Sequence, residues 1–321
     1  ILSGLVGSEM CIRDSTQTAR KHLATPPRRP VFTLDDAGLQ TLYQDLGRQG
    51  NGNLGVTTSG STDRASARTA NAAVGNKRNA TLLENVGGLT MTALAETVIC
   101  VTGADADVTV GGRPAPLATP TIVPAGAEVV VKPARLGFRT YVAVRGGLIA
   151  DTELDSAATD MLSGLGPKPL AAGDTIAMSL TPPQSANSLL TNPLRVERDG
   201  ADVVGVVRCV LGPRDDWFDA DAVERFFNTT FTVTGDSNRV GLRLESDAPL
   251  TRSRDGELPS EGMVAGSVQI PPSGQPVLFL RDHAVTGGYP VIATVINEDV
   301  DIAAQLPPGG KLRFERYTLE G

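Results

Sequence analysis

Short apolar runs separated by glycine and proline turns fill most of the chain. Four of them follow one another in the first half, at Thr97–Thr102, Asp107–Val110, Ala127–Val131 and Arg139–Val144. Apolar runs of this length, bounded by turn residues, are typical of β-strands. Many short strands with frequent turns predict a β-sandwich or a closed β-barrel rather than a helical bundle.

A polar, proline-rich stretch at Leu180–Pro193 is the best candidate for a domain boundary. It separates an expected N-terminal β domain over residues 31–190 from an expected C-terminal β domain over residues 191–321. Further strands are expected at Met263–Ile270, Pro276–Leu280, Asp202–Leu211 and Lys311–Tyr317.

Helical patterns are few and short. Asp63–Asn76 carries small alanines that pack well and ends at Gly75-Asn76, which is typical of a helix C-terminus. Two more short helices are expected at Ala220–Asn228 and Asn297–Gln305, whereas the glycine-rich segment Asp36–Gly60 has loop character. The expected fold class is therefore mainly β with a few short helices.

Composition narrows the function classes. Aromatic residues make up only 4% of the chain, while Gly (35) and Pro (22) are plentiful, which agrees with short strands and tight turns. The net charge is −7, and without the first thirty residues 24 basic and 34 acidic side chains remain. An acidic chain without a basic patch argues against a nucleic-acid partner. No apolar run approaches 18 residues, so we expect no membrane span and a cytoplasmic location.

The first thirty residues are expected to lie outside the fold. Residues 1–15 (ILSGLVGSEMCIRDS) begin without methionine, are too short and badly flanked for a signal peptide, and look like translated sequencing adaptor. Thr16–Pro30 has the composition of a linker. Cys11 and His22 belong to this region.

The remaining cysteines and histidine give no metal motif. Cys100 and Cys209 lie in apolar runs, where a buried thiol is the usual state. One histidine, His283, remains after residue 30, so we expect no metal site built on several histidines.

Polar side chains collect at the ends of the strand-like runs in residues 258–290. A carboxylate or imidazole in this position can handle protons or orient a substrate, and we expect catalytic roles for Glu261, Asp282 and His283. Substrate-binding roles are expected for Gln269, Gly287, Gly288 and Tyr289, the two glycines presenting amides through positive φ. An ordinary sheet with polar loops explains the same pattern. In that case His283 is a turn residue whose ring is satisfied by the backbone, and Tyr289 is expected to be packed.

Other candidates for substrate binding lie outside this segment. Arg48 either pins a loop by pairing with Asp45 or holds a carboxylate or phosphoryl group. Arg239, four positions before Arg243 on a strand, joins it in an anion clamp, is solvated, or pairs with Glu245 and Asp247. Ser59, Asp63 and Asn71 complete the set of expected substrate-binding residues.

Residues 258–290 resemble the C-terminal signature of the biotin-dependent carboxyltransferase family, also called the family of allophanate hydrolase subunit 2 or of the 5-oxoprolinase C-type subunit. QDLGRQGNGNLGVTTSGSTDRASARTANAAVGN (residues 44–76) resembles the N-terminal signature of that family. Further matches follow in the family's order at Ala80–Glu84, Arg139–Gly147, Leu162–Asp174 and Asp236–Leu244. The resemblance implies two cyclophilin-like β-barrel domains.

The resemblance also implies an enzyme subunit. The first expectation is the C-type subunit of a prokaryotic 5-oxoprolinase, which acts with a second cyclophilin-like subunit (B type) and a third subunit (A type) in ATP-dependent hydrolysis of 5-oxo-L-proline to L-glutamate. The alternatives are carboxyl transfer from biotin to urea or a related amide, and a non-catalytic regulatory protein. The chain has neither a phosphate-binding loop nor a biotin-carrying Met-Lys-Met segment. ATP is therefore expected to act through the complex, and biotin, if used, to be carried by another polypeptide.

The chain departs from the family pattern just before the Leu162–Asp174 match. The family reads Leu-Gly-Ser-Arg-Ser-Thr, whereas this chain has Asp155 in place of the glycine and Ala157 in place of the arginine. If that arginine contacts a ligand or a partner, the contact is lost or altered here. Thr57-Thr58 also differs from relatives.

Overall fold

The computed structural model describes residues 28–180, 184–254, 256 and 258–318. The chain divides into two compact units, Ile1–Leu194 and Arg195–Gly321, and the division falls just after the proline-rich stretch. Most of the segment expected to be artefact and linker, including Cys11 and His22, lies outside the described residues. Its last three residues were expected to be linker, but Arg28–Pro30 begin the first strand.

The N-terminal unit contains a seven-stranded sheet with the order β11-β12-β1-β4-β9-β6-β7. Its neighbouring strands are antiparallel, so every ladder hydrogen bond is made between chain segments that run in opposite directions. The strands are β1 (Arg28–Asp36), β4 (Leu89–Ala93), β6 (Val108–Val110), β7 (Arg113–Pro114), β9 (Glu128–Val131), β11 (Leu148–Ile149) and β12 (Thr175–Ser179).

A five-stranded antiparallel sheet with the order β2-β3-β10-β5-β8 faces it. Its strands are β2 (Gln40–Gln44), β3 (Leu82–Val86), β5 (Thr97–Asp105), β8 (Thr121–Val123) and β10 (Leu136–Val144). Helix α2 (Arg64–Ala73) packs on β5 and β10, and the 3-10 turn η1 (Gly52–Leu54) lies in the loop before it.

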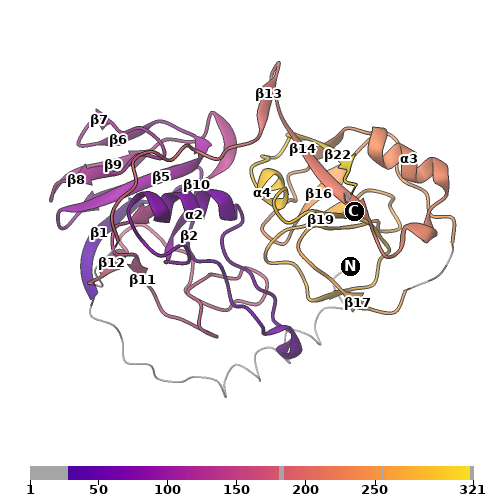
Figure 1. Ribbon diagram of the computed structural model, residues 1–321, viewed down its shortest axis with the longest axis horizontal. Helices are drawn as coiled ribbons and strands as arrows, with labels where there is room; N and C mark the ends of the chain where they lie inside the picture. Colours follow the sequence, from indigo (N-terminus) through magenta and orange to yellow (C-terminus); the bar gives the residue numbers. More distant parts are fainter. Residues whose placement is uncertain (1–27, 181–183, 255, 257, 319–321) are drawn as a thin grey trace. The chain divides into compact units, whose positions relative to one another are not determined.

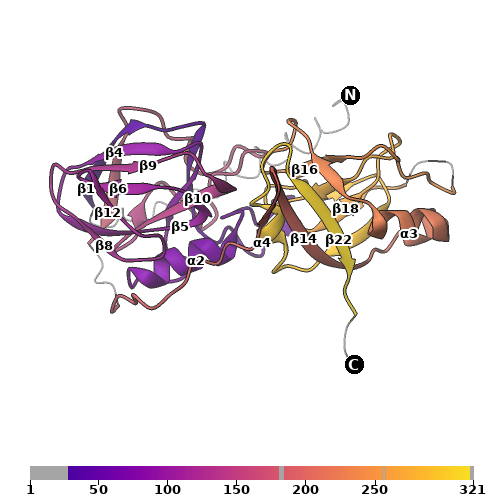
Figure 2. The same cartoon turned by 90° about the horizontal axis from the view of Figure 1, so that it is seen from above.

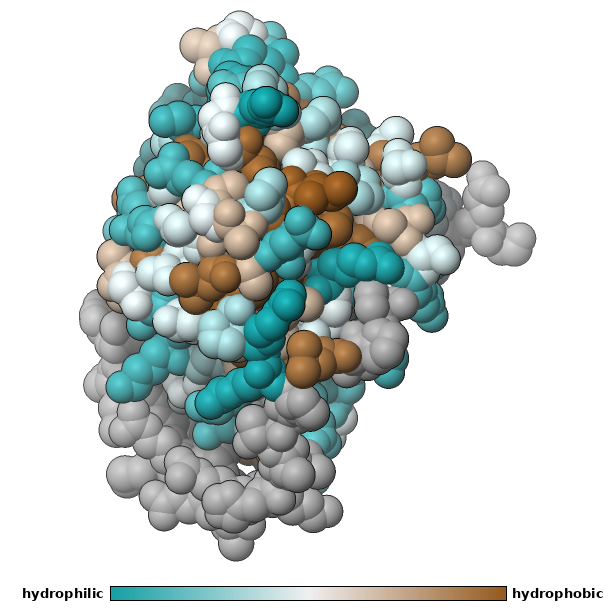
Figure 3. Space-filling model, turned by 90° about the vertical axis from the view of Figure 1, so that its left-hand side faces the viewer, coloured by the Kyte–Doolittle hydropathy of each residue, from teal (hydrophilic) through white to brown (hydrophobic). Residues whose placement is uncertain are grey.

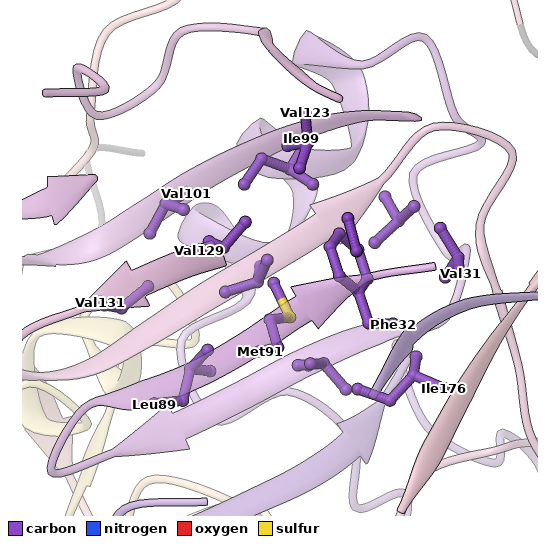
Figure 4. Packing of buried hydrophobic residues seen from close by; sticks show 14 of the residues in the cluster. Val31, Phe32, Leu89, Met91, Ile99, Val101, Val123, Val129, Val131 and Ile176 are labelled. Carbon is purple, nitrogen blue, oxygen red and sulfur yellow. The ribbon is translucent and has the colours of Figure 1, made fainter. Parts of the chain in front are cut away.

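One apolar core joins the two sheets. Phe32 and Met91 from the first sheet and Ile99 and Val142 from the second are at most 1% exposed and belong to the same cluster. Figure 4 shows Phe32, Met91, Val129 and Ile99 pointing toward one another between the strands. Burial of this kind supplies the main driving force for folding.

The C-terminal unit is a closed β-barrel. Seven strands follow the order β14-β21-β18-β19-β16-β15-β22, and a parallel ladder from β14 to β22 closes the ring. Strand β13 extends β14 as a hairpin, and Figures 1 and 2 show both barrel strands β14 and β22 side by side. The strands are β13 (Glu197–Asp199), β14 (Asp202–Leu211), β15 (Phe231–Val233), β16 (Gly241–Glu245), β18 (Ser267–Gln269), β19 (Val277–Phe279), β21 (Val291–Val295) and β22 (Lys311–Arg316).

Smaller elements cover the barrel. Helix α3 (Ala220–Asn228) is capped by Asp219 and buries Phe226, whose ring stacks on Phe314 of β22 at 4.4 Å. The other elements are the 3-10 turn η2 (Asp215–Trp217), helix α4 (Val300–Ala303) and a two-stranded ribbon of β17 (Glu261–Gly262) and β20 (Thr286–Gly287).

The expected mainly β architecture with few short helices is confirmed. The bounds of β14 and α3 are those expected, and Cys100 and Cys209 are buried. The expected loop over Asp36–Gly60 is wrong in part, because Gln40–Gln44 form β2 and pair along their whole length with β3. The last helix is shorter than expected.

Exposed apolar side chains are scattered over the N-terminal unit. Leu39, Leu94 and Ile122 are 82%, 49% and 65% exposed. On the face seen in Figure 3 the brown apolar surface is broken into separate patches by polar side chains. Single exposed apolar residues of this kind are normal in folded proteins. Among the described residues no helix is long and apolar enough to cross a membrane.

Candidate functional site

The β17–β20 ribbon brings together several of the residues expected to form a site. Glu261 pairs with Gly287 across the ribbon, and the Met263 amide donates to the Val285 carbonyl at 2.8 Å. The ribbon therefore fixes Glu261 against the segment that contains the two glycines.

The Glu261 carboxylate forms an ion pair with Arg214. Arg214 Nε lies 2.9 Å from Oε1 and 3.1 Å from Oε2, and Nη2 also contacts Oε1. The side chains of Arg214 and Glu261 are 37% and 25% exposed, so the pair lies at the surface of the barrel rather than in its core. The guanidinium thus holds both carboxylate oxygens in a fixed direction, which suits an orienting group.

Gln269 lies at the end of β18 and connects this ribbon to Tyr289. Its Nε2 donates to the Tyr289 carbonyl at 3.0 Å and contacts the Met263 sulfur at 3.5 Å. The side chain is 4% exposed, whereas Tyr289 is 42% exposed. The expectation of a packed Tyr289 is therefore wrong, and its ring lies at the surface beside a buried amide.

The two glycines do not act through positive φ. Neither Gly287 nor Gly288 has left-handed backbone, and Gly287 is a ladder residue of β20, so the expected outward nest of amides is wrong. The structure gives a different reason for Gly287, because a Cβ there would collide with Gln269 Nε2. At Gly288 the nearest atom to such a Cβ is the Leu258 carbonyl oxygen at 3.6 Å, an ordinary contact.

Replacement of Gly287 by alanine is therefore expected to displace Gln269 and to destabilise the barrel by about 1–3 kcal/mol, the usual effect of overpacking. Gly288→Ala is the matched control and should change the free energy of unfolding by less than about 0.5 kcal/mol. Urea unfolding of the two variants checks this. Equal effects at both positions would show that the contact with Gln269 does not limit residue size.

His283 is the one histidine among the described residues. A backbone carbonyl determines which of its ring nitrogens carries the proton. Its Nδ1 lies 2.8 Å from the Ala284 carbonyl oxygen, which can only accept, so Nδ1 carries the proton and Nε2 carries a lone pair. The ring stacks on Phe279 at 6.0 Å and is 7% exposed. Burial lowers the pKa of His283, while the hydrogen bond to Ala284 opposes that shift. A neutral imidazole with a free lone pair is the state that a general base needs.

Asp282, the residue before it, is committed to an ion pair. Its Oδ2 accepts from Arg239 Nε at 2.9 Å and its Oδ1 from Arg239 Nη2 at 3.0 Å. Their side chains are 0% and 2% exposed. This geometry favours an ion pair for Arg239 over an anion clamp or a solvated side chain, but the acid is Asp282, whereas Glu245 and Asp247 were expected. A bidentate buried pair positions the loop that carries His283.

The expected residues of the N-terminal unit form a separate network. The Asp45 carboxylate accepts from Ser156 Oγ at 2.7 Å and from the Ala157 amide at 2.8 Å. Arg48 is 1% exposed and donates from Nη2 to the Ala158 carbonyl at 2.5 Å. Asp45 and Arg48 therefore hold the 156–158 loop, which supports the pinning role of Arg48 rather than the binding of an anion.

Ser59, Asp63 and Asn71 are buried in the same unit. Asp63 caps α2 by accepting from the Ser66 amide at 2.9 Å, and Asn71 donates to the Ala80 carbonyl at 2.7 Å. Ser59 has φ 53° and is 0% exposed. Their substrate-binding roles stay predictions, and the observed contacts are those of a scaffold.

A buried carboxylate that sequence reasoning did not select lies below the start of α2. Glu84 accepts from the Thr62 amide at 2.8 Å and from the Tyr141 hydroxyl at 2.9 Å, and Arg139 lies 3.7 Å away. Burial, with the nearby charge of Glu84, raises the pKa of Tyr141 well above its usual value. Glu84 and Tyr141 lie within Ala80–Glu84 and Arg139–Gly147, two segments that resemble the family. This resemblance was the feature of the sequence that could have pointed to them.

Strained backbone marks the position where the chain departs from the family. Asp155 has φ 61°, a conformation that favours glycine, and it stands where the family has glycine. Ala157, which stands where the family has arginine, is 2% exposed. Asp155 thus adopts the left-handed backbone conformation of a glycine turn, although its side chain makes this conformation strained.

Asp155→Gly is expected to raise the free energy of unfolding by about 1 kcal/mol, because glycine adopts this φ without strain. Asp155→Ala is the matched control and should not stabilise the protein, since it keeps a Cβ and loses the polar side chain that tolerates this region. Thermal or urea unfolding separates the two. A stabilising alanine would contradict the backbone explanation.

The described residues contain no group of three or more His, Cys, Asp or Glu side chains arranged to hold a metal ion. A polar groove of about 640 Å³ lies elsewhere on the C-terminal unit and contains none of the expected site residues. It is lined by Asp199, Asp202, Val204, Thr230, Thr232, Glu245, Ser246, Asp247, Gln275, Lys311 and Arg313.

A nucleotide phosphate does not fit the N-termini of the two longer helices, α2 and α3. Helices α2 and α3 begin at Asp63 and Asp219, whose carboxylates already accept from the Ser66 and Ala222 amides. A phosphate would meet a carboxylate at each of these ends, where an anion site needs free amides. Neither the start of α2 nor the start of α3 therefore offers free amides for a nucleotide phosphate.

The chain belongs to the carboxyltransferase domain family. The family model for the carboxyltransferase domain, subdomains A and B, matches residues 54–316. The C-terminal barrel and the two-sheet N-terminal unit are thus parts of a known enzyme-domain architecture.

Two of the relatives bear the name of the C-type subunit of 5-oxoprolinase. The Escherichia coli protein is 31% identical over 88% of this chain and 90% of its own length. The Haemophilus influenzae protein is 30% identical over 89% of this chain and 91% of its own length. Urea amidolyase of Lachancea kluyveri is 28% identical, and the match covers 98% of this chain but 18% of that protein.

Solved structures agree with this assignment. The crystal structure of TTHA0988 matches with a TM-score of 0.78 and 33% identity over 91% of this chain. The match spans 57% of the TTHA0988 chain, a little over half of its length. The urea amidolyase of K. lactis matches with a TM-score of 0.84 and 25% identity, over 98% of this chain and 20% of that one.

Proposed function

We propose that the chain is the C-type subunit of a 5-oxoprolinase and contributes to the ATP-dependent hydrolysis of 5-oxo-L-proline to L-glutamate. The observation that carries this proposal is the match to two proteins of that name at 31% and 30% identity over nine-tenths of their length. Relatives of this kind belong to enzyme complexes, so partner subunits of the A and B types complete the proposed assembly.

The C-terminal site suits the opening of a lactam. Hydrolysis adds water to the ring carbonyl, breaks the C–N bond and leaves a carboxylate and an amine. His283 Nε2, as the neutral acceptor, would take the proton from the attacking water. Glu261, held by Arg214, and the Gln269 amide would orient the lactam.

ATP would supply the activation that an unstrained amide needs before water can attack it. Since the described helix ends are occupied by aspartates, we assign the nucleotide to the partner subunits. Within this chain the task is to bind and orient the lactam and to move a proton at His283. The reaction is proposed to take place in the cytoplasm.

Reconstitution of the complex with and without this chain tests the proposal. The chain from Thr16 is co-expressed with the proteins encoded beside it, and glutamate formed from 5-oxo-L-proline and ATP is measured. We expect glutamate from the complete set and none without this chain. Equal glutamate with and without the chain would refute an enzymatic role for it.

Carboxyl transfer is the second candidate. The family model describes a carboxyltransferase domain, and the structural match to urea amidolyase has a TM-score of 0.84. In that case biotin would arrive on another polypeptide and a urea-like amide would take the carboxyl group. Biotin-carrier-dependent carboxylation of urea by the assembled proteins, without glutamate formation from 5-oxo-L-proline, would favour this candidate.

A further inference from the structure

Arg252 lies beside the candidate site and was not selected from the sequence. Its guanidinium carbon is 5.6 Å from the centre of the Tyr289 ring, and its Nη2 donates to the Ile270 carbonyl at 2.7 Å. Ile270 follows Gln269, whose amide contacts the Tyr289 carbonyl at 3.0 Å. Arg252 is thus held by a hydrogen bond to the residue after β18 and lies over the half-exposed ring of Tyr289.

The charge of Arg252 has no anionic partner among the described residues. Its Nε is buried and makes no hydrogen bond within the described part of the chain. Desolvation lowers the pKa of Arg252, and no carboxylate of the described residues counteracts that shift. A half-buried guanidinium that lies over an aromatic ring, with no carboxylate partner among the described residues, is in the state that favours capture of an anion.

The neighbouring cations are already neutralised. Arg214 pairs with Glu261, and Arg254 pairs with Asp216 at 2.8 Å. Of these three arginines, Arg252 alone lacks an acidic partner among the residues that the structure describes. The single positive charge of one guanidinium matches a singly charged carboxylate better than a phosphoryl group, which carries a second negative charge.

We propose that Arg252, held against Tyr289, is the subsite that binds the carboxylate of the substrate. This inference rests on the proposed function, in which the substrate is a lactam that carries one carboxylate. The carboxylate contacts the guanidinium, and the ring lies toward Tyr289 and Gln269. Arg252 is then a specificity-determining residue that selects carboxylated lactams from neutral amides.

Equilibrium binding to the assembled complex tests this directly. Calorimetry with 5-oxo-L-proline and with 2-pyrrolidinone, the same lactam without the carboxylate, gives a ratio of dissociation constants. We expect 5-oxo-L-proline to bind at least about tenfold more tightly in the wild type, and Arg252→Gln to reduce that preference by about tenfold to a hundredfold, as for the loss of a charge-assisted hydrogen bond. Arg252→Lys should keep part of the preference, because it keeps the charge without the planar fork.

Arg254→Gln is the matched control, since Arg254 is an exposed arginine two residues away that is paired with Asp216. It should leave the ratio unchanged. An unchanged ratio in Arg252→Gln, with a normal unfolding curve, would overturn the inference. So would a wild type that binds both lactams equally, or inorganic phosphate that competes better than 5-oxo-L-proline.

The failure of the inference can be told from the failure of the proposed function. If the complex forms glutamate and Arg252→Gln leaves KM unchanged, the inference falls and the function stands. If the complex forms no glutamate but prefers the carboxylated lactam through Arg252, the function falls and the carboxylate subsite stands.

Discussion

Replacement of Arg239 by methionine is expected to destabilise the C-terminal barrel by about 3–5 kcal/mol, because it leaves the Asp282 carboxylate buried without its partner. The two side chains are 2% and 0% exposed and share two hydrogen bonds of 2.9 and 3.0 Å. Loss of this magnitude is a large part of the stability of an ordinary domain. Urea unfolding followed by circular dichroism measures it.

Removal of both charges is the control. Arg239→Met combined with Asp282→Leu is expected to recover much of the loss, since a well-packed apolar pair can replace a buried ion pair. If the double variant is as unstable as the sum of the single ones, the pair is not the source of the effect. Asp282→Asn separates the predicted catalytic role from the positioning role, because a catalytic loss lowers kcat in protein that remains folded.

His283→Ala is expected to lower the kcat of the assembled complex about 10²- to 10⁴-fold, the usual contribution of a general base. The reason is that His283 Nδ1 is committed to the Ala284 carbonyl, which leaves Nε2 as the proton acceptor. Glutamate formation at saturating 5-oxo-L-proline measures kcat. Retained activity in a stable His283→Ala complex would remove His283 from the mechanism.

The pH dependence follows from the burial of His283. Burial lowers its pKa below the ordinary value of 6.5, so the neutral form is favoured in the folded protein. Between the two pKa values the unfolded chain binds more protons, so the free energy of unfolding rises with pH in this window and falls when the pH is lowered from 6.5. His283→Gln should remove this part of the slope, and kcat/KM of the wild type should rise with pH through a value below 6.5. A wild-type slope equal to that of His283→Gln would contradict a depressed pKa.

The elements that were predicted correctly from the sequence are those whose own residue pattern determines their secondary structure. Asp202–Leu211 and Ala220–Asn228 begin and end where expected, because a valine-rich apolar run favours a strand and an aspartate cap sets the start of the helix. Strand β2 was missed because Gln40, Thr41 and Gln44 are polar, and their burial depends on pairing with β3. Tertiary pairing overrode the local composition there.

Only some residues of the candidate site could be predicted from the sequence. Polar residues at strand ends led to Glu261, Gln269 and His283, which the ribbon and the barrel strands bring into one region. Their partners could not be found, since Arg214 lies 47 residues from Glu261 and Arg239 lies 43 residues from Asp282. Such pairs are set by the register of the barrel rather than by spacing. The role of Gly287 was also misread, because its need for a small side chain comes from Gln269.

The most direct test offers the assembled complex two substrates. Purified complex with ATP is given 5-oxo-L-proline in one reaction, and urea with bicarbonate and a biotin carrier in the other. The account predicts glutamate in the first reaction and no carboxylated urea in the second. Carboxylated urea without any glutamate from 5-oxo-L-proline would contradict it.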